Sequence, residues 1–133
     1  MAKAAAPAPT PTTPVRFVDG PAPDFCGALH GREDIVPLFA KGCGGGDMEG
    51  CSRLAFFYQC GLGVPRDPRR AFTLARRACD HGYLAACADA GAFAGQLPGA
   101  APADLAAGAR ALEKGCAGNE RNSCFNLSLA ILS

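Results

Sequence analysis

The sequence predicts an all-α fold, a solenoid of three stacked helical hairpins. Six of the eight cysteines form three pairs of the pattern Cys-x(7)-Cys, which recur at intervals of 36 and 37 residues: Cys43 and Cys51, Cys79 and Cys87, Cys116 and Cys124. Apolar residues recur with helical spacing on both sides of each pair, and residues typical of tight turns lie inside it. A unit repeated in this way buries its apolar face against its neighbours, as the units of α-solenoids do.

Each unit is expected to contain two helices. Before the second cysteine pair, small and apolar residues fall at i, i+3, i+4 and i+7: Ala71, Leu74, Ala75 and Ala78. After the second cysteine of each pair, further apolar residues lie three and seven positions on. We therefore expect helices at about residues 33–43, 49–60, 68–79, 84–95, 105–116 and 122–132. They group into hairpins at about 32–60, 68–96 and 104–133.

The residues between the helices agree with this division. The third residue after each first cysteine is Gly46, Gly82 or Asn119, and these types best tolerate the left-handed conformation that ends a helix. Before the second hairpin, Asp67 is expected to cap a helix whose first residue is Pro68. Asp104 is expected to take the same capping place before the third hairpin.

Residues 1–24 differ in composition from the rest of the chain. They hold six of the eleven prolines and show no apolar periodicity, so we expect a disordered leader rich in Ala, Pro and Thr. Proline interrupts the segment before an apolar run long enough for a secretory signal can form. Residues 25–133 then form the repeat domain.

Composition narrows the classes of partner. The chain has 133 residues, with 13 Lys and Arg against 12 Asp and Glu, and its net charge is +1. This length fits one small domain, and the near-zero net charge disfavours binding to nucleic acid. No apolar stretch is long enough for a membrane span. We expect another protein as the partner, and no cofactor.

The paired cysteines favour disulfides. One cysteine at the end of a helix and another at the start of the next lie within bonding distance across a short turn. A loop of this size contributes roughly 2.5 kcal/mol in the chain-entropy model, which would support an alanine-rich core. Free, buried thiols are the alternative, and a zinc site is disfavoured because its ligands usually come from much closer pairs. Cys26 and Cys60 either pair with each other or stay free.

Other candidates for chemistry have ordinary structural explanations. His30 and His81 lie in no metal-binding spacing, and we expect them to be exposed turn residues. Five arginines around the second hairpin are expected to form a solvated face, with an acidic partner as the alternative: Arg66, Arg69, Arg70, Arg76 and Arg77. The aromatic run Phe56, Phe57 and Tyr58 is expected to pack between hairpins, with a partner-binding patch as the alternative. No catalytic motif is present, so we favour a non-enzymatic role.

The segment YQCGLGVPRDPRRAFTLARRACDHGYLAAC resembles the Sel-one-like repeat, a tetratricopeptide-like helical hairpin. The resemblance extends over roughly residues 25–133, although the third unit has Ala94 in place of Tyr and LPGA in place of the glycine loop. Arg70 stands where the repeat usually has Lys. The matching residues, with the turn glycine, are Tyr58, Gly61, Gly63, Val64, Asp67, Ala71 and Gly82.

The cysteine pairs resemble those of the Helicobacter cysteine-rich proteins, and the C-terminal end resembles the cytochrome c oxidase assembly factor seven type. The second resemblance implies an interaction scaffold that assists a respiratory complex in the mitochondrial intermembrane space. The first implies a bacterial protein of the periplasm or the secreted fraction, with penicillin-binding or weak β-lactamase activity. The lack of a visible export signal, combined with the expected disulfides, also points to the intermembrane space, whereas both activities are implied by the resemblance alone.

Overall fold

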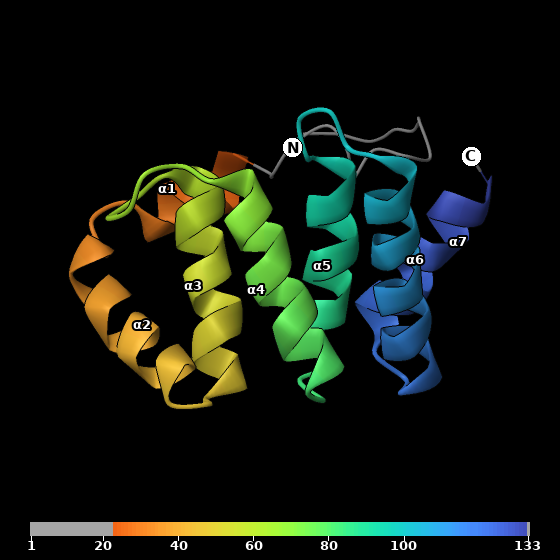
Figure 1. Cartoon of the computed structure of the whole chain (residues 1–133), viewed down its shortest axis with the longest axis horizontal. Coiled ribbons are helices and arrows are strands. Elements are labelled where there is room, and N and C mark those ends of the chain that lie inside the picture. Colours follow the sequence, from red (N-terminus) through yellow and green to blue (C-terminus); the bar gives the residue numbers. More distant parts are fainter. Residues whose placement is uncertain (1–22, 133) are drawn as a thin grey trace.

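The computed structural model describes residues 23–132, and this part of the chain is helical with no strand (Figure 1). The predicted leader therefore lies almost entirely outside the described residues. The elements are α1 (Pro23–Leu29), the short 3-10 helix η2 (Glu33–Ile35), α2 (Val36–Gly44), α3 (Met48–Cys60), α4 (Pro68–Asp80), α5 (Ala85–Gly95), α6 (Pro102–Ala117) and α7 (Arg121–Leu132).

The predicted solenoid is confirmed. Helices α2 and α3, α4 and α5, and α6 and α7 form three hairpins, and these lie side by side along the long axis of the molecule (Figure 1). The second helix of each hairpin packs against the first helix of the next, so one core runs through all three. None of the helices in residues 23–132 has the length and apolar character needed to cross a bilayer.

Two elements differ from the sequence prediction. Helix α1 was not expected, and its first two residues lie in the segment assigned to the leader. Residues 33–35 form the 3-10 helix η2, so α2 begins at Val36 instead of residue 33. Pro37 fits here because the first positions of a helix require no backbone N–H donor.

The turns inside the hairpins have the predicted backbone. Gly46, Gly82 and Asn119 all adopt positive φ values, of 100°, 97° and 68°. Asn119 is the one non-glycine residue with a positive φ in the described chain, and asparagine is among the few side chains that tolerate this region. The same turn therefore ends the first helix of every hairpin.

The cap predictions succeed once and fail once. The Asp67 carboxylate accepts a hydrogen bond of 3.0 Å from the Arg70 backbone N–H and caps α4, as expected. Asp104 does not cap α6, because that helix begins at Pro102, and Ala101 is its N-cap. Asp104 instead lies inside the first turn and accepts a hydrogen bond of 3.0 Å from the Ala101 N–H. Proline at the first position allows this earlier start.

The core is assembled mainly from small side chains. Few large apolar side chains are fully buried. Six alanines are: Ala55, Ala71, Ala75, Ala78, Ala86 and Ala90. Glycine brings α5 and α6 together, since a Cβ added at Gly108 would lie 2.5 Å from the Ala94 Cβ. A Cβ at Gly91 would likewise overlap the Leu112 side chain. The second and third hairpins therefore stack closely where a side chain is missing.

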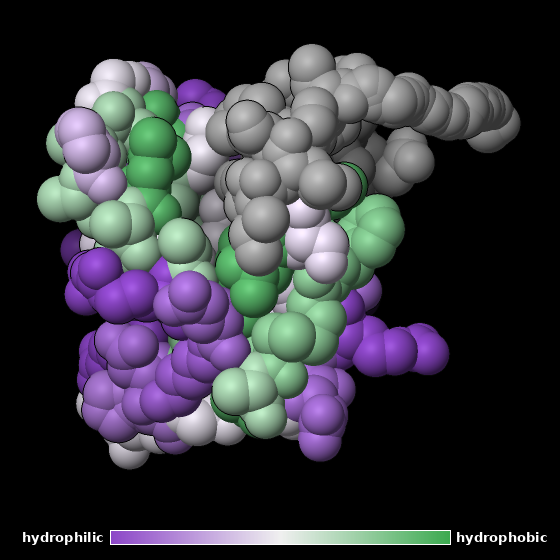
Figure 2. Space-filling model, turned by 90° about the vertical axis from the view of Figure 1, so that its right-hand side faces the viewer, coloured by the Kyte–Doolittle hydropathy of each residue, from purple (hydrophilic) through white to green (hydrophobic). Residues whose placement is uncertain are grey.

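The third hairpin exposes a position that the first two bury. Ser52 and Ala88 follow the second cysteine of their pairs and are 4% and 7% exposed, whereas the equivalent Phe125 on α7 is 65% exposed. Figure 2 looks at this end of the solenoid and shows apolar and strongly polar surface side by side. The α7 surface thus differs from the tightly packed surfaces of α3 and α5.

We expect Gly108→Ala to lower the free energy of unfolding by about 1–3 kcal/mol, because overpacking forces α5 and α6 apart. Gly44→Ala is the matched control, since Gly44 is helical and exposed with no heavy atom within 4 Å of an added Cβ. It should be neutral or stabilising by up to about 1 kcal/mol. Urea unfolding followed by circular dichroism measures both. Equal effects of the two substitutions would contradict the close packing.

Candidate functional site

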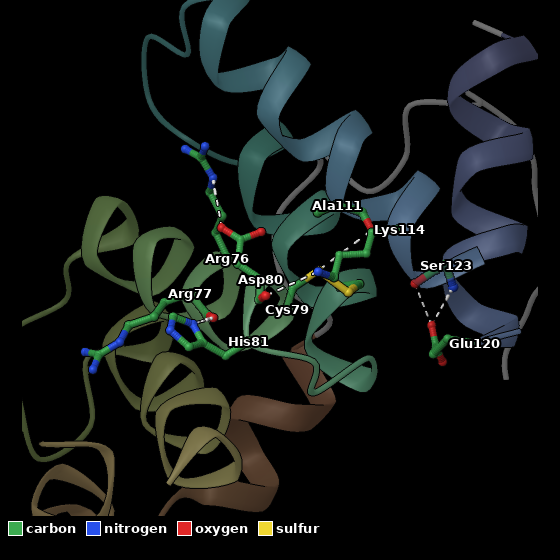
Figure 3. Close-up of a disulfide and its surroundings, with 10 residues drawn as sticks. Arg76, Arg77, Cys79, Asp80, His81, Ala111, Lys114, Glu120 and Ser123 are labelled. Carbon is green, nitrogen blue, oxygen red and sulfur yellow. Dashed lines mark hydrogen bonds and ion pairs between the residues drawn. A yellow bond between two sulfur atoms is a disulfide. The ribbon is translucent and has the colours of Figure 1, made fainter. Parts of the chain in front are cut away.

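Each hairpin is closed by a disulfide across its turn. Cys43 bonds to Cys51, Cys79 to Cys87 and Cys116 to Cys124, with Cα–Cα distances of 4.5, 4.7 and 4.5 Å. This confirms the predicted fold of three stapled hairpins. The middle staple also lies at a hairpin interface, because the Cys79 sulfur is 3.9 Å from the carbonyl oxygen of Ala111 on α6 (Figure 3).

A fourth disulfide lies outside the repeat pattern. The sequence left Cys26 and Cys60 either paired or free, and the structure joins them, with a Cα–Cα distance of 5.7 Å. The bond fixes α1 against the end of α3, across a sequence separation of 34 residues. All eight cysteines are therefore oxidised. Four disulfides indicate an oxidising compartment, such as the periplasm, the extracellular space or the intermembrane space.

The histidines and possible metal ligands form no cluster. His30 and His81 are exposed, and the His81 Nδ1–H donates to the Arg77 carbonyl oxygen over 2.9 Å in the turn after α4 (Figure 3). Within residues 23–132, no three side chains of His, Cys, Asp or Glu come together in an arrangement that could hold a metal ion.

The arginine cluster separates into individual contacts. Arg69 makes a bidentate ion pair with Asp104 over 2.7 and 2.9 Å, which joins α4 to α6. This hydrogen bonding by Arg69, together with the Ala101 N–H, lowers the pKa of Asp104 to about 2. Arg70 lies 5.2 Å above the Tyr58 ring in a cation–π contact. These arginines thus bind neighbouring helices rather than form one free patch.

The other arginines of the cluster have weaker or local contacts. The Arg66 Nε–H donates to the Gln59 carbonyl oxygen over 3.1 Å. Arg76 approaches the Asp80 carboxylate to 3.9 Å, and both side chains are half exposed (Figure 3). Arg77 is exposed and points away from its neighbours in the same view.

The residues of the repeat signature form the link between the first two hairpins. Gly61 and Gly63 both have positive φ, and a Cβ at Gly63 would lie 2.9 Å from the Val36 side chain. The Asp67 N–H donates to the Tyr58 carbonyl oxygen over 2.9 Å, which closes the loop. Ala71 is fully buried on α4. The signature therefore holds the link against both hairpins.

The two phenylalanines of the aromatic run pack against different helices, α2 and α5. Phe57 is 1% exposed and its ring centroid lies 6.2 Å from that of Phe39 on α2. Phe56 makes an edge-to-face contact with Phe93 on α5 at 5.5 Å. Packing between hairpins is thus the principal role of these rings, although both phenylalanines also line a surface pocket.

Two polar contacts were missed in the sequence analysis, one between repeats and one within the third hairpin. The Gln59 amide donates to the Gln96 side-chain oxygen over 2.7 Å, and Gln59 is 1% exposed. Their separation of 37 residues equals one repeat, and this spacing is the one sign of the pair in the sequence. Near the third hairpin, Glu120 accepts hydrogen bonds from the Ser123 N–H and hydroxyl over 2.7 and 2.6 Å (Figure 3).

Asp89 on α5 is an unusual carboxylate. Burial raises its pKa to about 7, and the negative charge of Glu120 adds to the shift. Asp89 lies two residues after the second cysteine of its hairpin, where the third hairpin has Asn126. At neutral pH the folded protein therefore holds a carboxyl group that is only partly ionised.

A pocket of about 240 Å³ opens at the first hairpin, between α1, η2, α2 and α3. Six apolar or aromatic residues and two arginines form its wall, with no acidic side chain: Ala28, Leu29, Arg32, Ile35, Phe39, Arg53, Phe56 and Phe57. Arg53 is paired with Glu49 over 2.8 Å. The sequence analysis missed this pocket because Ala28 and Leu29 of its wall belong to α1, a helix outside the repeat that was not predicted.

These features define a cysteine-rich α-solenoid whose hairpins are stapled by disulfides. The family model of the Sel1 repeat matches residues 49–83, from α3 through the link and α4 to the turn before α5. No curated protein and no solved structure matches the chain. The match and the disulfides together support a cysteine-rich protein of Sel1-like repeats.

Removing one staple should weaken the fold without abolishing it. For the double variant Cys79→Ala and Cys87→Ala, we expect the free energy of unfolding to fall by about 2–3 kcal/mol, the chain-entropy value for so short a loop. Urea unfolding under non-reducing conditions measures the change, and peptide mapping checks that the other three pairs remain. An unchanged unfolding midpoint would show that the staple does not stabilise the folded state.

The raised pKa of Asp89 predicts a pH dependence of stability. Because the folded state holds this proton more tightly than the unfolded state, the free energy of unfolding should fall as the pH rises from about 4 to about 7. Asp89→Asn cannot ionise and should be more stable than the natural chain by about 1–3 kcal/mol at pH 8, with little difference near pH 4.

Asp34→Asn serves as the control for Asp89→Asn, because it makes the same change in net charge at an exposed position. Urea unfolding at both pH values compares the three proteins. A variant Asp89→Asn whose stability follows that of the natural chain at both pH values would contradict the burial of an ionisable carboxyl group.

Proposed function

We propose that the protein is a non-enzymatic scaffold that binds another protein through its stacked hairpins in an oxidising compartment. The stapled solenoid is the observation that carries this proposal. Sel1 repeats generally mediate contacts between proteins, and a rigid array of hairpins presents side chains from successive helices to one partner. The disulfides within the hairpins and the ion pair of Arg69 with Asp104 between two of them keep that array in one shape, which lowers the entropic cost of binding.

Within this function, we propose a role in the mitochondrial intermembrane space as an assembly factor or accessory subunit of cytochrome c oxidase. Two observations support the proposal: the four disulfides, which suit a compartment where imported chains are trapped by oxidation, and the resemblance of the C-terminal end to assembly factors of this complex.

Deletion of the gene in its source organism tests this role. We expect cytochrome c oxidase activity to fall while succinate dehydrogenase activity, the internal control, stays unchanged. Expression of the natural chain should restore the oxidase. Unchanged oxidase activity after deletion, or a source organism that has no mitochondria, would overturn the assembly role.

The second candidate is a secreted or periplasmic bacterial protein that binds penicillins or hydrolyses β-lactams weakly. The cysteine pair repeated in each hairpin is the feature that favours it, through the resemblance to bacterial cysteine-rich repeat proteins. A chromogenic β-lactam tests this candidate, with the reduced and alkylated protein as control. Turnover above that of the control would support hydrolysis and overturn the non-enzymatic proposal, whereas equal rates would remove hydrolysis from this candidate.

A further inference from the structure

We propose that the pocket at the first hairpin binds a short segment of the partner protein in which an aromatic residue adjoins Asp or Glu. This inference rests on the proposed function, since it names the surface by which the scaffold would bind. It depends on three properties of the pocket: its size, its charge and the way it is built.

The size of the pocket suits one side chain. Ligand pockets for small molecules usually have volumes of about 300–1,000 Å³, and this one has about 240 Å³. An apolar cavity of about 150 Å³ is enough to hold a benzene molecule. The partly exposed rings of Phe39 and Phe56 contribute to the wall, and aromatic rings favour edge-to-face packing with another ring. A single aromatic anchor therefore fits better than a cofactor.

The positive charge of the pocket wall favours an anionic group beside the aromatic anchor. Both charged residues of the wall are arginines. Arg53 is already compensated by Glu49 on the same helix, over 2.8 Å. Arg32 makes no ion pair or side-chain hydrogen bond within the described residues and is exposed. Glu33 and Asp34 follow it in the chain but do not line the pocket. One positive charge thus remains for a carboxylate, which a guanidinium binds in bidentate fashion.

The fourth disulfide builds the pocket. Ala28 and Leu29 belong to α1, which the bond between Cys26 and Cys60 fixes to the end of α3. Helix α1 has seven residues and is too short to be stable without tertiary contacts. Without this bond, α1 should leave the wall, while the hairpins keep their own staples. The non-repeat disulfide therefore acts as the support of the binding pocket.

A tryptophan peptide tests the proposal directly, because the chain contains no Trp and its background emission is low. The probe is acetyl-Gly-Ser-Asp-Trp-Ser-Gly-amide, titrated with the whole protein. We expect a blue shift of the Trp emission on binding. Replacing the Asp of the peptide by Asn should weaken binding about 3-fold, and replacing its Trp by Phe should be tolerated in competition. Failure of the probe to bind would overturn the proposal.

Variants of the protein locate the site. Arg32→Gln should weaken binding about 3-fold, and Ala28→Leu, which fills the pocket, should abolish it. Arg77→Gln is the matched control, because Arg77 is an exposed arginine on α4, away from the pocket, and it should bind like the natural chain. Equal binding by Arg32→Gln and Arg77→Gln would show that Arg32 does not hold the carboxylate. Binding by Ala28→Leu would place the peptide elsewhere.

Two disulfide variants test whether binding of the probe depends on the Cys26–Cys60 bond or on the hairpin disulfides. The double variant Cys26→Ser and Cys60→Ser should lose the probe but keep the circular dichroism spectrum of the hairpins. The double variant Cys116→Ser and Cys124→Ser should keep the probe. A second peptide with an amide-free C-terminal Trp, acetyl-Gly-Ser-Gly-Ser-Trp, tests a chain terminus as the occupant, and its binding in place of the first probe would overturn the proposal.

The deletion strain distinguishes this inference from the proposed function. If Ala28→Leu restores oxidase activity as fully as the natural chain, the pocket is not the binding surface, and the assembly role stands. If the natural chain restores activity and Ala28→Leu does not, the pocket proposal is supported.

Discussion

The close stacking of helices through alanine and glycine is the constraint on which the rest of this structure depends. Such interfaces bury little apolar area per residue, so the hydrophobic effect alone leaves the solenoid marginal. They also leave no room for error, as the overlap of an added Cβ at Gly91 or Gly108 shows. The disulfides supply the missing stability because they lower the conformational entropy of the unfolded chain. They do so without adding large side chains to a core that has no room for them.

Contacts between hairpins complete the assembly with polar groups. Arg69 and Asp104 join the first helices of the second and third hairpins, and Lys114 on α6 donates to the Asp80 carbonyl oxygen over 3.2 Å (Figure 3). The hydrogen bond between the Gln59 and Gln96 side chains joins the first hairpin to the second. These contacts add to the close packing in fixing how neighbouring hairpins lie relative to one another. A scaffold with a defined angle presents its surface to a partner with a smaller loss of entropy.

Sequence reasoning succeeded where the structure is local. The repeated cysteines, the turn residues Gly46, Gly82 and Asn119, and the cap at Asp67 each act within a few positions of the chain, so the printed sequence predicts them well. It failed at Asp104 because a proline two positions earlier starts the helix first. Interactions across hairpins, such as Asp89 with Glu120, depend on distances in the stack, and no spacing along the chain reveals whether two like charges meet.

The unequal loop lengths of the disulfides bear on how the chain acquires them. Eight cysteines allow on the order of a hundred pairings, yet three native bonds join the nearest partners, eight positions apart, and only Cys26 and Cys60 are distant, at 34. Closing the longer loop costs about 1.3 kcal/mol more entropy. A chain that enters its compartment as an extended thread would therefore oxidise one hairpin at a time, with few mispairings for an isomerase to correct, and the helix beside the pocket would be locked last.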